Sequence, residues 1–486
     1  MTTVVKGMKP EGVWKYFAEI SRIPRGSKNE SAIIQYVLDT AHKLGLQAKT
    51  DKAGNVVVRK PASKGHSHIR PVILQGHLDM VCEKNKDKDH DFLKDPIELV
   101  RKGNILAANG TTLGADNGIA VATNLAIMED CSLKHGPLEL LFTVDEETGM
   151  TGALNLAPDF LESRTLLNLD SEEEGTLYVG CAGGKDTTGT WKVAFDRPPV
   201  RSVFVQVKVT NLKGGHSGLE IDKGRGNAVK IANRILLSLD SIGARLSCIE
   251  GGSKHNAIPR ECEAHLFIPE NKIEPAENIV GELSTAISGE LAFVDPDLKI
   301  EFVADYGGRK NGKVIKRASQ RKILRSIAAL PHGVIKMSEE ITGLVETSTN
   351  VAVVSTAKDS LSIATSQRSS VVSALTEIVD TVSAVFFLGG ASVHYTDGYP
   401  GWKPDMRSPI LKTARSAYRS LYGKSIQVKA IHAGLECGVI GKRIPGMDMI
   451  SFGPTVKGAH SPDERIYIDS VGKFWKFLME ILKSIQ

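Results

Sequence analysis

Two histidines and several carboxylates are placed where they could bind metal ions. They lie in five short runs at residues 76–79, 114–118, 145–149, 169–170 and 458–464. Imidazole and carboxylate groups are the mixed nitrogen and oxygen ligands that suit divalent cations. Two such cations sharing a bridging carboxylate activate water for hydrolysis. The runs therefore predict a hydrolytic site with two metal ions.

Spacing within two of these runs suggests a division of roles. His77 and Asp79 stand two residues apart, so in an extended segment they face the same side, and Asp79 can orient the imidazole from behind. Glu146 and Glu147 are consecutive, so one can bind metal while the other moves protons. Spacing alone does not decide which does which. An acidic triplet such as 145–147 is also typical of a solvated loop.

Apolar segments lead directly into these acidic and histidine residues. Residues 71–75, 138–144 and 165–169 are predicted strands, and they deliver His77, the 145–147 triplet and Asp170. Sites in open α/β sheets form at the carboxyl ends of strands, which favours one shared site over three unrelated loops. Asp116 precedes a predicted helix at 119–128 and could instead be its N-cap. Its association with the other runs favours a metal ligand.

The pattern changes after about residue 184. Alternating valines between 203 and 209 predict a strand with one polar face, and 227–239 predicts an amphipathic helix. A strand at 261–267, a hairpin of 350–355 with 360–365, and a helix at 371–387 follow. We expect an α+β domain at 186–396, inserted between catalytic segments 1–185 and 397–486. The insertion would explain how His460 joins ligands from the first third of the chain.

Composition indicates an ordinary globular protein with two domains. The 486 residues are 41% hydrophobic and 24% charged, with a formal net charge of +5 and no basic run with interleaved aromatics. We therefore expect no nucleic acid partner. The N-terminus lacks the apolar core of a signal peptide, and no stretch approaches a membrane span of roughly 20 apolar residues. Six cysteines without CxxC spacing predict free thiols and a cytoplasmic location.

Taken together, the motifs resemble a known family. His77-x-Asp79, the 114–118 run, Glu146-Glu147-x-Gly149, Asp170 and the late His460 resemble the co-catalytic zinc peptidases, which include carboxypeptidase G, dipeptidase V and peptidase T. Within that family the runs are most similar to the aminoacyl-histidine dipeptidases. The resemblance covers the whole chain. It implies an α/β catalytic domain, with a central mixed sheet flanked by helices, and an inserted α+β lid domain.

The resemblance also implies roles for individual residues. His77 and Asp170 would bind one metal ion, Glu147 and His460 the other, and Asp116 would bridge the two. Glu146 would be the general base, and Asp79 would support His77. Two Zn²⁺ ions are expected, with Co²⁺ or Mn²⁺ as alternatives, because ligand chemistry does not choose among them.

The resemblance places substrate contacts in the inserted domain. His216, Asn256 and Arg368 match the family's lid histidine and its contacts to the substrate carboxylate. Without the resemblance, His216 would be a loop residue and Arg368 a surface salt bridge. His432 and Glu436 could line the substrate pocket, and the sequence does not decide their role.

The resulting hypothesis is a cytoplasmic two-metal dipeptidase that prefers Xaa-His substrates, including carnosine-like ones. An N-acyl amino acid deacylase, a tripeptidase and a non-catalytic binding protein on the same scaffold are alternatives. The expected partner is a small peptide, with no nucleic acid and no membrane. A homodimer remains open, because relatives include monomers and dimers.

Overall fold

The computed structural model describes residues 3–307 and 312–485. The described chain divides into two compact units. Unit 1 comprises residues up to Cys181, Trp402–Ala430 and Leu435 onward, and unit 2 comprises Ala182–Gly401 and Ile431–Gly434. Residues 431–434, which the sequence analysis assigns to the last catalytic segment, therefore group with unit 2.

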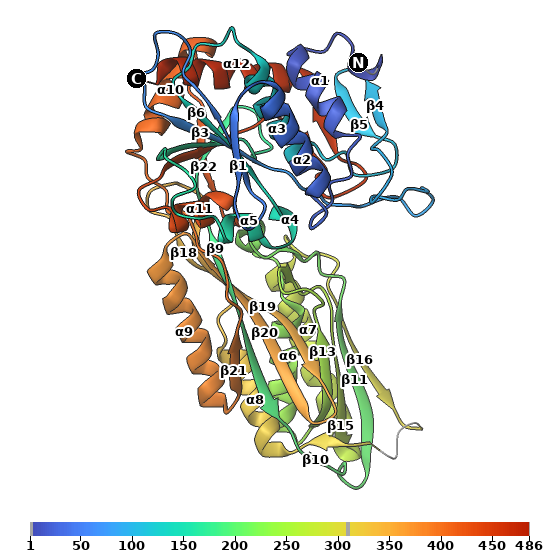
Figure 1. The fold of residues 1–486 in the computed structure, drawn as a ribbon. Helices are drawn as coiled ribbons and strands as arrows, with labels where there is room; N and C mark the ends of the chain where they lie inside the picture. The colour runs from blue at the N-terminus through green and yellow to red at the C-terminus, as the bar shows by residue number, and fades with distance from the viewer. Residues whose placement is uncertain (1–2, 308–311, 486) are drawn as a thin grey trace. The chain divides into compact units, whose positions relative to one another are not determined.

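Unit 1 is built on an 8-stranded mixed sheet, in which β1, β3, β6 and β22 are labelled in Figure 1. The strand order is β1-β2-β6-β3-β7-β23-β8-β22. Strands β6, β3, β7 and β23 are mutually parallel, whereas β1 and β2 pair antiparallel with their neighbours and β8 pairs antiparallel with β23. The strands are β1 (Gln47–Thr50), β2 (Val56–Lys60), β3 (Val72–His77), β6 (Leu138–Thr143), β7 (Thr165–Asn168), β8 (Thr176–Cys181), β22 (Gln427–Ile431) and β23 (Asp448–Ser451). The mixed α/β architecture expected from the sequence is confirmed.

The central strands of this sheet are buried along their whole length. Every residue of β3 and β6 is buried, as expected for strands covered on both faces. Helices α2 and α3 pack on β2 and β3, and α10 packs on β23. The helices of unit 1 are α1 (Glu11–Ile20), α2 (Ser31–Lys43), α3 (Ala115–Glu129), α4 (Glu146–Gly149), α5 (Thr151–Leu154), α10 (Pro409–Tyr422), α11 (Glu436–Arg443) and α12 (Ile468–Ser484).

A second, 4-stranded sheet of unit 1 positions His460. Its order is β24 (Val456–Lys457), β25 (Arg465–Tyr467), β5 (Ile105–Ala108) and β4 (Leu99–Lys102). The 458–464 run is the connection between β24 and β25. Gly458 and His460 both have positive φ there, at 71° and 63°, so the connection turns sharply at the histidine.

Unit 2 is an antiparallel 9-stranded sheet with four long helices (Figure 1). Its order is β16-β11-β15-β13-β19-β20-β9-β21, with β18 also paired to β19. The strands are β9 (Gly183–Lys192), β11 (Ser202–Thr210), β13 (Arg245–Gly251), β15 (Cys262–Pro269), β16 (Lys299–Asp305), β18 (Gly333–Met337), β19 (Val345–Thr356), β20 (Ser360–Ser369) and β21 (Ser392–Tyr395). The helices are α6 (Ala228–Ser241), α7 (Ile273–Leu291), α8 (Arg317–Ala329) and α9 (Val372–Gly389).

The predicted alternation in β11 is confirmed. Its valines are buried against α6, whereas Gln206 and Lys208 are half-buried and lie beside Glu263 of β15. The predicted hairpin is also confirmed, as β19 and β20. Two short pairs complete the described strands of unit 2: β10 (Phe195–Asp196) with β17 (Val314–Ile315), and β12 (Gly215–His216) with β14 (Ala257–Ile258).

Helix α9 corrects the expectation that no segment approaches a membrane span. By length and composition alone, this 18-residue helix could cross a membrane, and 33% of it is buried. Val382 and Phe386 belong to the core of unit 2, and the Phe386 ring packs edge-on against Trp191. One such helix is weak evidence for a membrane, because core helices have the same composition.

Candidate metal centre and its relatives

The histidine and carboxylate side chains predicted from unit 1 converge at the carboxyl ends of its parallel strands. His77 is the last residue of β3, Asp170 follows β7, and Glu146 opens α4 directly after β6. Among the described residues, four groups of potential ligands have their atoms within 4.8 Å of one another. Three contain proposed ligands: His77 with Asp116 and Asp170, Asp116 with Glu147 and His460, and His77 with Glu146 and Glu147. The fourth is Glu30 with Asp79 and Asp145.

Asp116 lies between the two histidines. Its Oδ1 is 3.1 Å from Nε2 of His77, and its Oδ2 is 3.2 Å from Nε2 of His460. Each carboxylate oxygen therefore faces a different imidazole, as a group shared by two cations would. Asp116 and Asn117 have non-helical backbone angles, so the continuous part of α3 begins after them. The contacts of the Asp116 carboxylate are with the two histidines, which favours the metal-ligand interpretation over the N-cap.

The remaining distances divide the site into two halves. Oδ1 of Asp170 lies 3.3 Å from Nε2 of His77 and is buried without a hydrogen bond. Oε2 of Glu147 lies 3.0 Å from Nε2 of His460. Five donors thus form two overlapping groups that share Asp116, and their nitrogen and oxygen chemistry fits two divalent cations.

The electrostatics show a concentration of negative charge. Hydrogen bonds to Asp116 and Glu147 raise the pKa of His460 to about 11. Burial alone would lower the pKa of His77, but Asp170 and Asp116 hold it well above its usual value. Burial raises the pKa of Asp170 to about 7. Such a cluster attracts cations, because buried carboxylates need positive charge nearby.

Asp79 supports both sides of the site. Its Oδ1 is 3.3 Å from Nδ1 of His77, and its two oxygens accept from the backbone N–H groups of Glu146 and Glu147 at 3.1 and 3.2 Å. Ser27 donates a further hydrogen bond at 2.8 Å. Although burial opposes ionisation, the hydrogen bond and charge of His77 lower the pKa of Asp79 to about 2.

Glu146 differs from its neighbour. Its carboxylate makes no hydrogen bond or ion pair with any described residue, whereas that of Glu147 contacts His460. Burial raises the pKa of Glu146 well above its usual value, and nearby acids add to this effect. A free carboxylate with high proton affinity is suited to taking up a proton.

Asp145, to which the sequence assigned no role, holds the turn that presents Glu146. It has φ of 52° and accepts hydrogen bonds from the hydroxyls of Thr148 and Thr151. Its backbone N–H donates to Glu30. We therefore interpret Asp145 as a structural residue.

Sequence reasoning missed several residues that position the site. The carboxylate of Glu464 accepts from four consecutive backbone N–H groups, those of residues 113–116, at 2.7–3.1 Å. Arg25 is buried and donates to the carbonyls of Leu78, Asp79 and Gly114. Glu464 lies in a recognised run, so it could have been suspected. Arg25 has no local pattern that would single it out.

Asn117 joins two of the strand ends. The Asp116–Asn117 peptide bond is cis. The side-chain oxygen of Asn117 accepts from the backbone N–H of His77 at 3.2 Å, and its amide donates to the carbonyl of Leu169 at 3.0 Å. One amide side chain therefore fixes the backbone of His77 and that of Leu169, the residue before Asp170.

The predicted substrate residues lie in unit 2, and two of them are adjacent. His216 of β12 pairs with Ala257 of β14, and the backbone N–H of Ser217 donates to the carbonyl of Asn256. Nδ1 of His216 accepts from the N–H groups of Gly218 and Leu219, both at 3.1 Å. The ring proton of a neutral His216 must therefore be on Nε2, which is left as a donor.

Arg368 of β20 is buried, which excludes the surface salt bridge. It donates from Nη1 to the hydroxyl of Tyr399 at 2.7 Å, and its Nε is buried without a partner. Burial lowers the pKa of His216, and the charge of Arg368 contributes, so the two side chains are electrostatic neighbours. Nε2 of His432, whose role the sequence does not decide, forms a hydrogen bond of 2.7 Å with the hydroxyl of Ser348.

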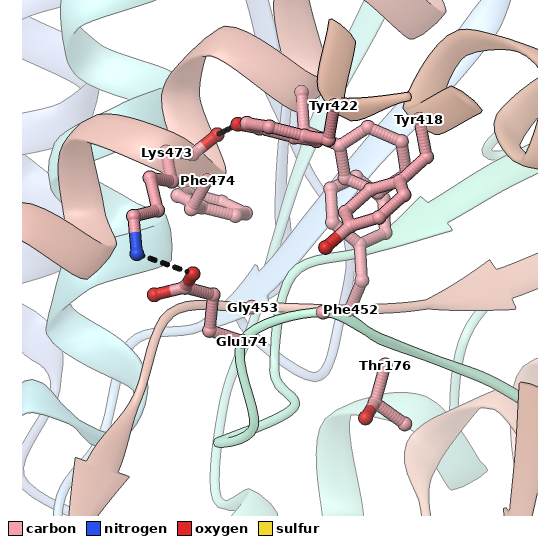
Figure 2. A pocket seen from close by; sticks show the side chains of 10 residues that line it. Glu174, Thr176, Tyr418, Tyr422, Phe452, Gly453, Lys473 and Phe474 are labelled. Atoms are coloured by element: carbon pink, nitrogen blue, oxygen red, sulfur yellow. Dashed lines mark hydrogen bonds and ion pairs between the residues drawn. The ribbon is translucent and has the colours of Figure 1, made fainter. Parts of the chain in front are cut away.

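A small cavity elsewhere in unit 1 is unsuited to a substrate. It encloses about 20 Å³ between α10, α12 and the segment after β23, and aromatic rings line it (Figure 2). The Lys473–Glu174 ion pair at 2.8 Å lies beside these rings. This volume holds about one water molecule. We interpret the cavity as a packing defect in an aromatic cluster.

Comparison with known proteins identifies the family. The profile of Peptidase family M20/M25/M40 matches residues 73–484, a segment that includes every predicted site residue. The chain belongs to this family. It is therefore a metal-dependent peptidase, and the resemblance inferred from its motifs is confirmed.

Three known proteins show different degrees of similarity to this chain. The chain is 41% identical over 481 residues to the cytosol non-specific dipeptidase of Escherichia coli, covering 98% of both chains. It matches the crystal structure of an aminoacylhistidine dipeptidase from Vibrio alginolyticus with a TM-score of 0.93 and 39% identity, covering 99% of this chain and 98% of that one. A tripeptidase from Staphylococcus aureus, at 17% identity, 98% coverage of both chains and a TM-score of 0.56, shares the fold alone.

All six cysteines are free, as predicted.

Proposed function

We propose that this protein is a cytoplasmic dipeptidase that uses two divalent metal ions and accepts Xaa-His dipeptides among its preferred substrates. The observation that carries the proposal is the position of Asp116, whose two oxygens face His77 and His460 from opposite sides. The names of the relatives from Escherichia coli and Vibrio alginolyticus support the substrate class.

His77 and Asp170 would hold one ion, Glu147 and His460 the other, and Asp116 would be shared. When bound, the ions would supply positive charge that lowers the pKa of water and stabilises a developing oxyanion. Zn²⁺ suits these ligands, and so do Co²⁺ and Mn²⁺. Asp79 fixes His77 with Nε2 toward the site, because Nδ1 faces the Asp79 carboxylate.

Glu146 would be the general base. Its free carboxylate takes the proton of the attacking water as the carbonyl carbon becomes tetrahedral, then gives that proton to the leaving amine nitrogen. The raised pKa suits both transfers, because a base of very low pKa would not return the proton efficiently.

Unit 2 would supply the substrate contacts, as a lid domain. His216 can donate from Nε2 to the carbonyl oxygen of the scissile bond, since its Nδ1 is already engaged as an acceptor. Asn256 and Arg368 would bind the substrate carboxylate. Tyr399 holds one arm of the Arg368 guanidinium, which limits the orientations of its fork.

A substrate panel with and without metal tests the proposal. Chelation should abolish hydrolysis, and added Zn²⁺ or Mn²⁺ should restore it. Xaa-His dipeptides should be cleaved faster than Xaa-Leu dipeptides, tripeptides and N-acetyl amino acids. Preferred cleavage of N-acetyl amino acids would reassign the protein as a deacylase, and preferred cleavage of tripeptides would make it a tripeptidase. Full activity after complete metal removal would refute the mechanism.

A further inference from the structure

A carboxyl group that the proposed mechanism does not use is buried beside the metal centre. Glu436 is the first residue of α11 and is fully buried. Its Oε2 accepts from Nε2 of Gln75 at 2.6 Å and from the hydroxyl of Thr143 at 2.7 Å. Gln75 lies two residues before His77 on β3, and Thr143 is the last residue of β6, three before Glu146. Glu436 is therefore attached to two strands that deliver site residues.

The same two strands belong to a longer polar network. The side-chain oxygen of Gln75 accepts from the amide of Asn168 at 2.5 Å, and Asn168 accepts from the hydroxyl of Ser451. These contacts satisfy Gln75 and Asn168 but leave Glu436 with one unused oxygen. Its Oε1 is buried and has no hydrogen-bond partner.

The surroundings of Glu436 provide little to stabilise a negative charge. The titratable groups that face it are His77 at the end of β3, Asp79 after β3, Glu146 of α4, Asp170 after β7 and Cys437, the next residue of α11. Strand β8, which packs against α11, carries Tyr178 and Cys181. Helix α5, packed against α11, has no titratable side chain, and Lys442 and Arg443 lie in the last turn of α11. Three of the facing groups are carboxylates, so the one nearby positive group is a protonated His77.

We infer that Glu436 is a charge-balancing residue of the metal centre, protonated while the centre lacks metal and ionised when two divalent ions bind. The carboxyl O–H bond breaks on metal loading, and the proton leaves to the solvent. Glu436 would contact no metal ion, so it acts through the charge of the site. The inference rests on the ligands proposed above.

Electrostatics support this exchange. Burial raises the pKa of Glu436 to about 8, so near neutral pH the metal-free protein carries most of this proton. Two divalent ions would add four positive charges to a cluster in which Asp79, Asp116, Glu147 and Asp170 supply up to four negative ones. The positive charge gained on metal binding, at the ends of β3 and β7, favours ionised Glu436. Metal binding is then linked to proton release by a residue outside the ligand set.

Counting protons during metal binding tests the inference. The metal-free protein is titrated calorimetrically with Mn²⁺ alone, under nitrogen, in two buffers of different protonation enthalpy. At pH 7 the wild type should release about one proton more than Glu436→Gln, and at pH 9 the difference should fall to about a tenth of a proton, because Glu436 is then already ionised. The glutamine oxygen can still accept from Gln75 and Thr143, so the variant changes charge and little else.

Two further variants serve as controls. Glu139→Gln replaces another buried glutamate, which lies near the start of β6 and pairs with Arg59 at 3.3 Å. Proton release by this variant should match that of the wild type. Thr143→Val removes a donor that favours the ionised form, so the extra proton should persist to higher pH. This variant tests Glu436 even if Glu436→Gln does not fold.

The outcomes separate the two proposals. Equal proton release by wild type and Glu436→Gln at pH 7, with two ions bound to each, overturns the inference and leaves the proposed ligands standing. An unchanged pH range in Thr143→Val also counts against it. Failure of the wild type to bind two ions contradicts the proposed ligand set itself.

Discussion

Glu464 offers a sharp test of how the site is positioned. Its two carboxylate oxygens accept from the N–H groups of residues 113–116, the loop that presents Asp116. Glu464→Gln replaces one oxygen with an amide that can only donate, so two of the four N–H groups lose their acceptor. A buried donor left unpaired costs about 1–3 kcal/mol. We therefore expect a loss of about 2–6 kcal/mol in the free energy of unfolding.

The substitution should also weaken metal binding. Changes to residues that orient metal ligands typically cost about 10–100-fold in affinity. Urea unfolding of the metal-free protein at pH 8 and calorimetric titration with Mn²⁺ measure the two effects. Asp463→Asn is the matched control, because it removes the same charge from an exposed neighbour and should change stability by less than about 0.5 kcal/mol. Equal stability and equal affinity in the two variants would refute the positioning role.

Two other perturbations have expected outcomes. Asp79→Ala removes the carboxylate behind His77 and the acceptor for the N–H groups of Glu146 and Glu147, so Mn²⁺ affinity should fall about 10–100-fold; unchanged affinity in calorimetry would contradict this. Burial raises the pKa of Glu172 and Glu436 to about 8 from the usual 4.5, so the folded metal-free protein retains protons that the unfolded chain loses. The stability contributed by these groups is present below pH 4.5 and is lost as pH rises through 8. Glu436→Gln should flatten the fall in urea midpoint between pH 5.5 and 8.5, and a slope equal to that of the wild type would oppose the interpretation.

The strands that deliver the site were predictable because they are continuously apolar. Burial on both faces of a parallel sheet requires such runs, and β3, β6 and β7 appear close to their predicted ranges. Strand β19 begins at Val345, five residues earlier than predicted. The first residues of this strand, 346–350, are polar. Thr347 and Thr349 are nevertheless buried, and they are hydrogen-bonded to Ser369 and Gln367 of β20. Cross-strand pairing of this kind leaves no apolar pattern.

Some features of the candidate site could likewise be predicted from the sequence, and others could not. Residue types and strand ends predicted where His77 and Asp170 meet, because both lie at one edge of a sheet. The roles of Glu146 and Glu147 could not be assigned from the sequence, because the two residues are consecutive. Their roles depend on which carboxylate contacts His460, a residue more than 300 positions later in the chain. Arg25, Glu464 and Glu436 act through contacts between segments far apart in sequence. No local pattern encodes such contacts.

The most direct test of the proposed mechanism compares Glu146→Gln with Glu147→Gln. Metal content by atomic absorption and kcat for an Xaa-His dipeptide are measured on both variants. Glu146→Gln should retain two ions per chain while kcat falls by about 10²–10⁴-fold or more, because only proton transfer is lost. Glu147→Gln should lose metal affinity. A kcat within about threefold of the wild type for Glu146→Gln, or loss of its metal with retention in Glu147→Gln, would contradict the assignment of Glu146 as the base.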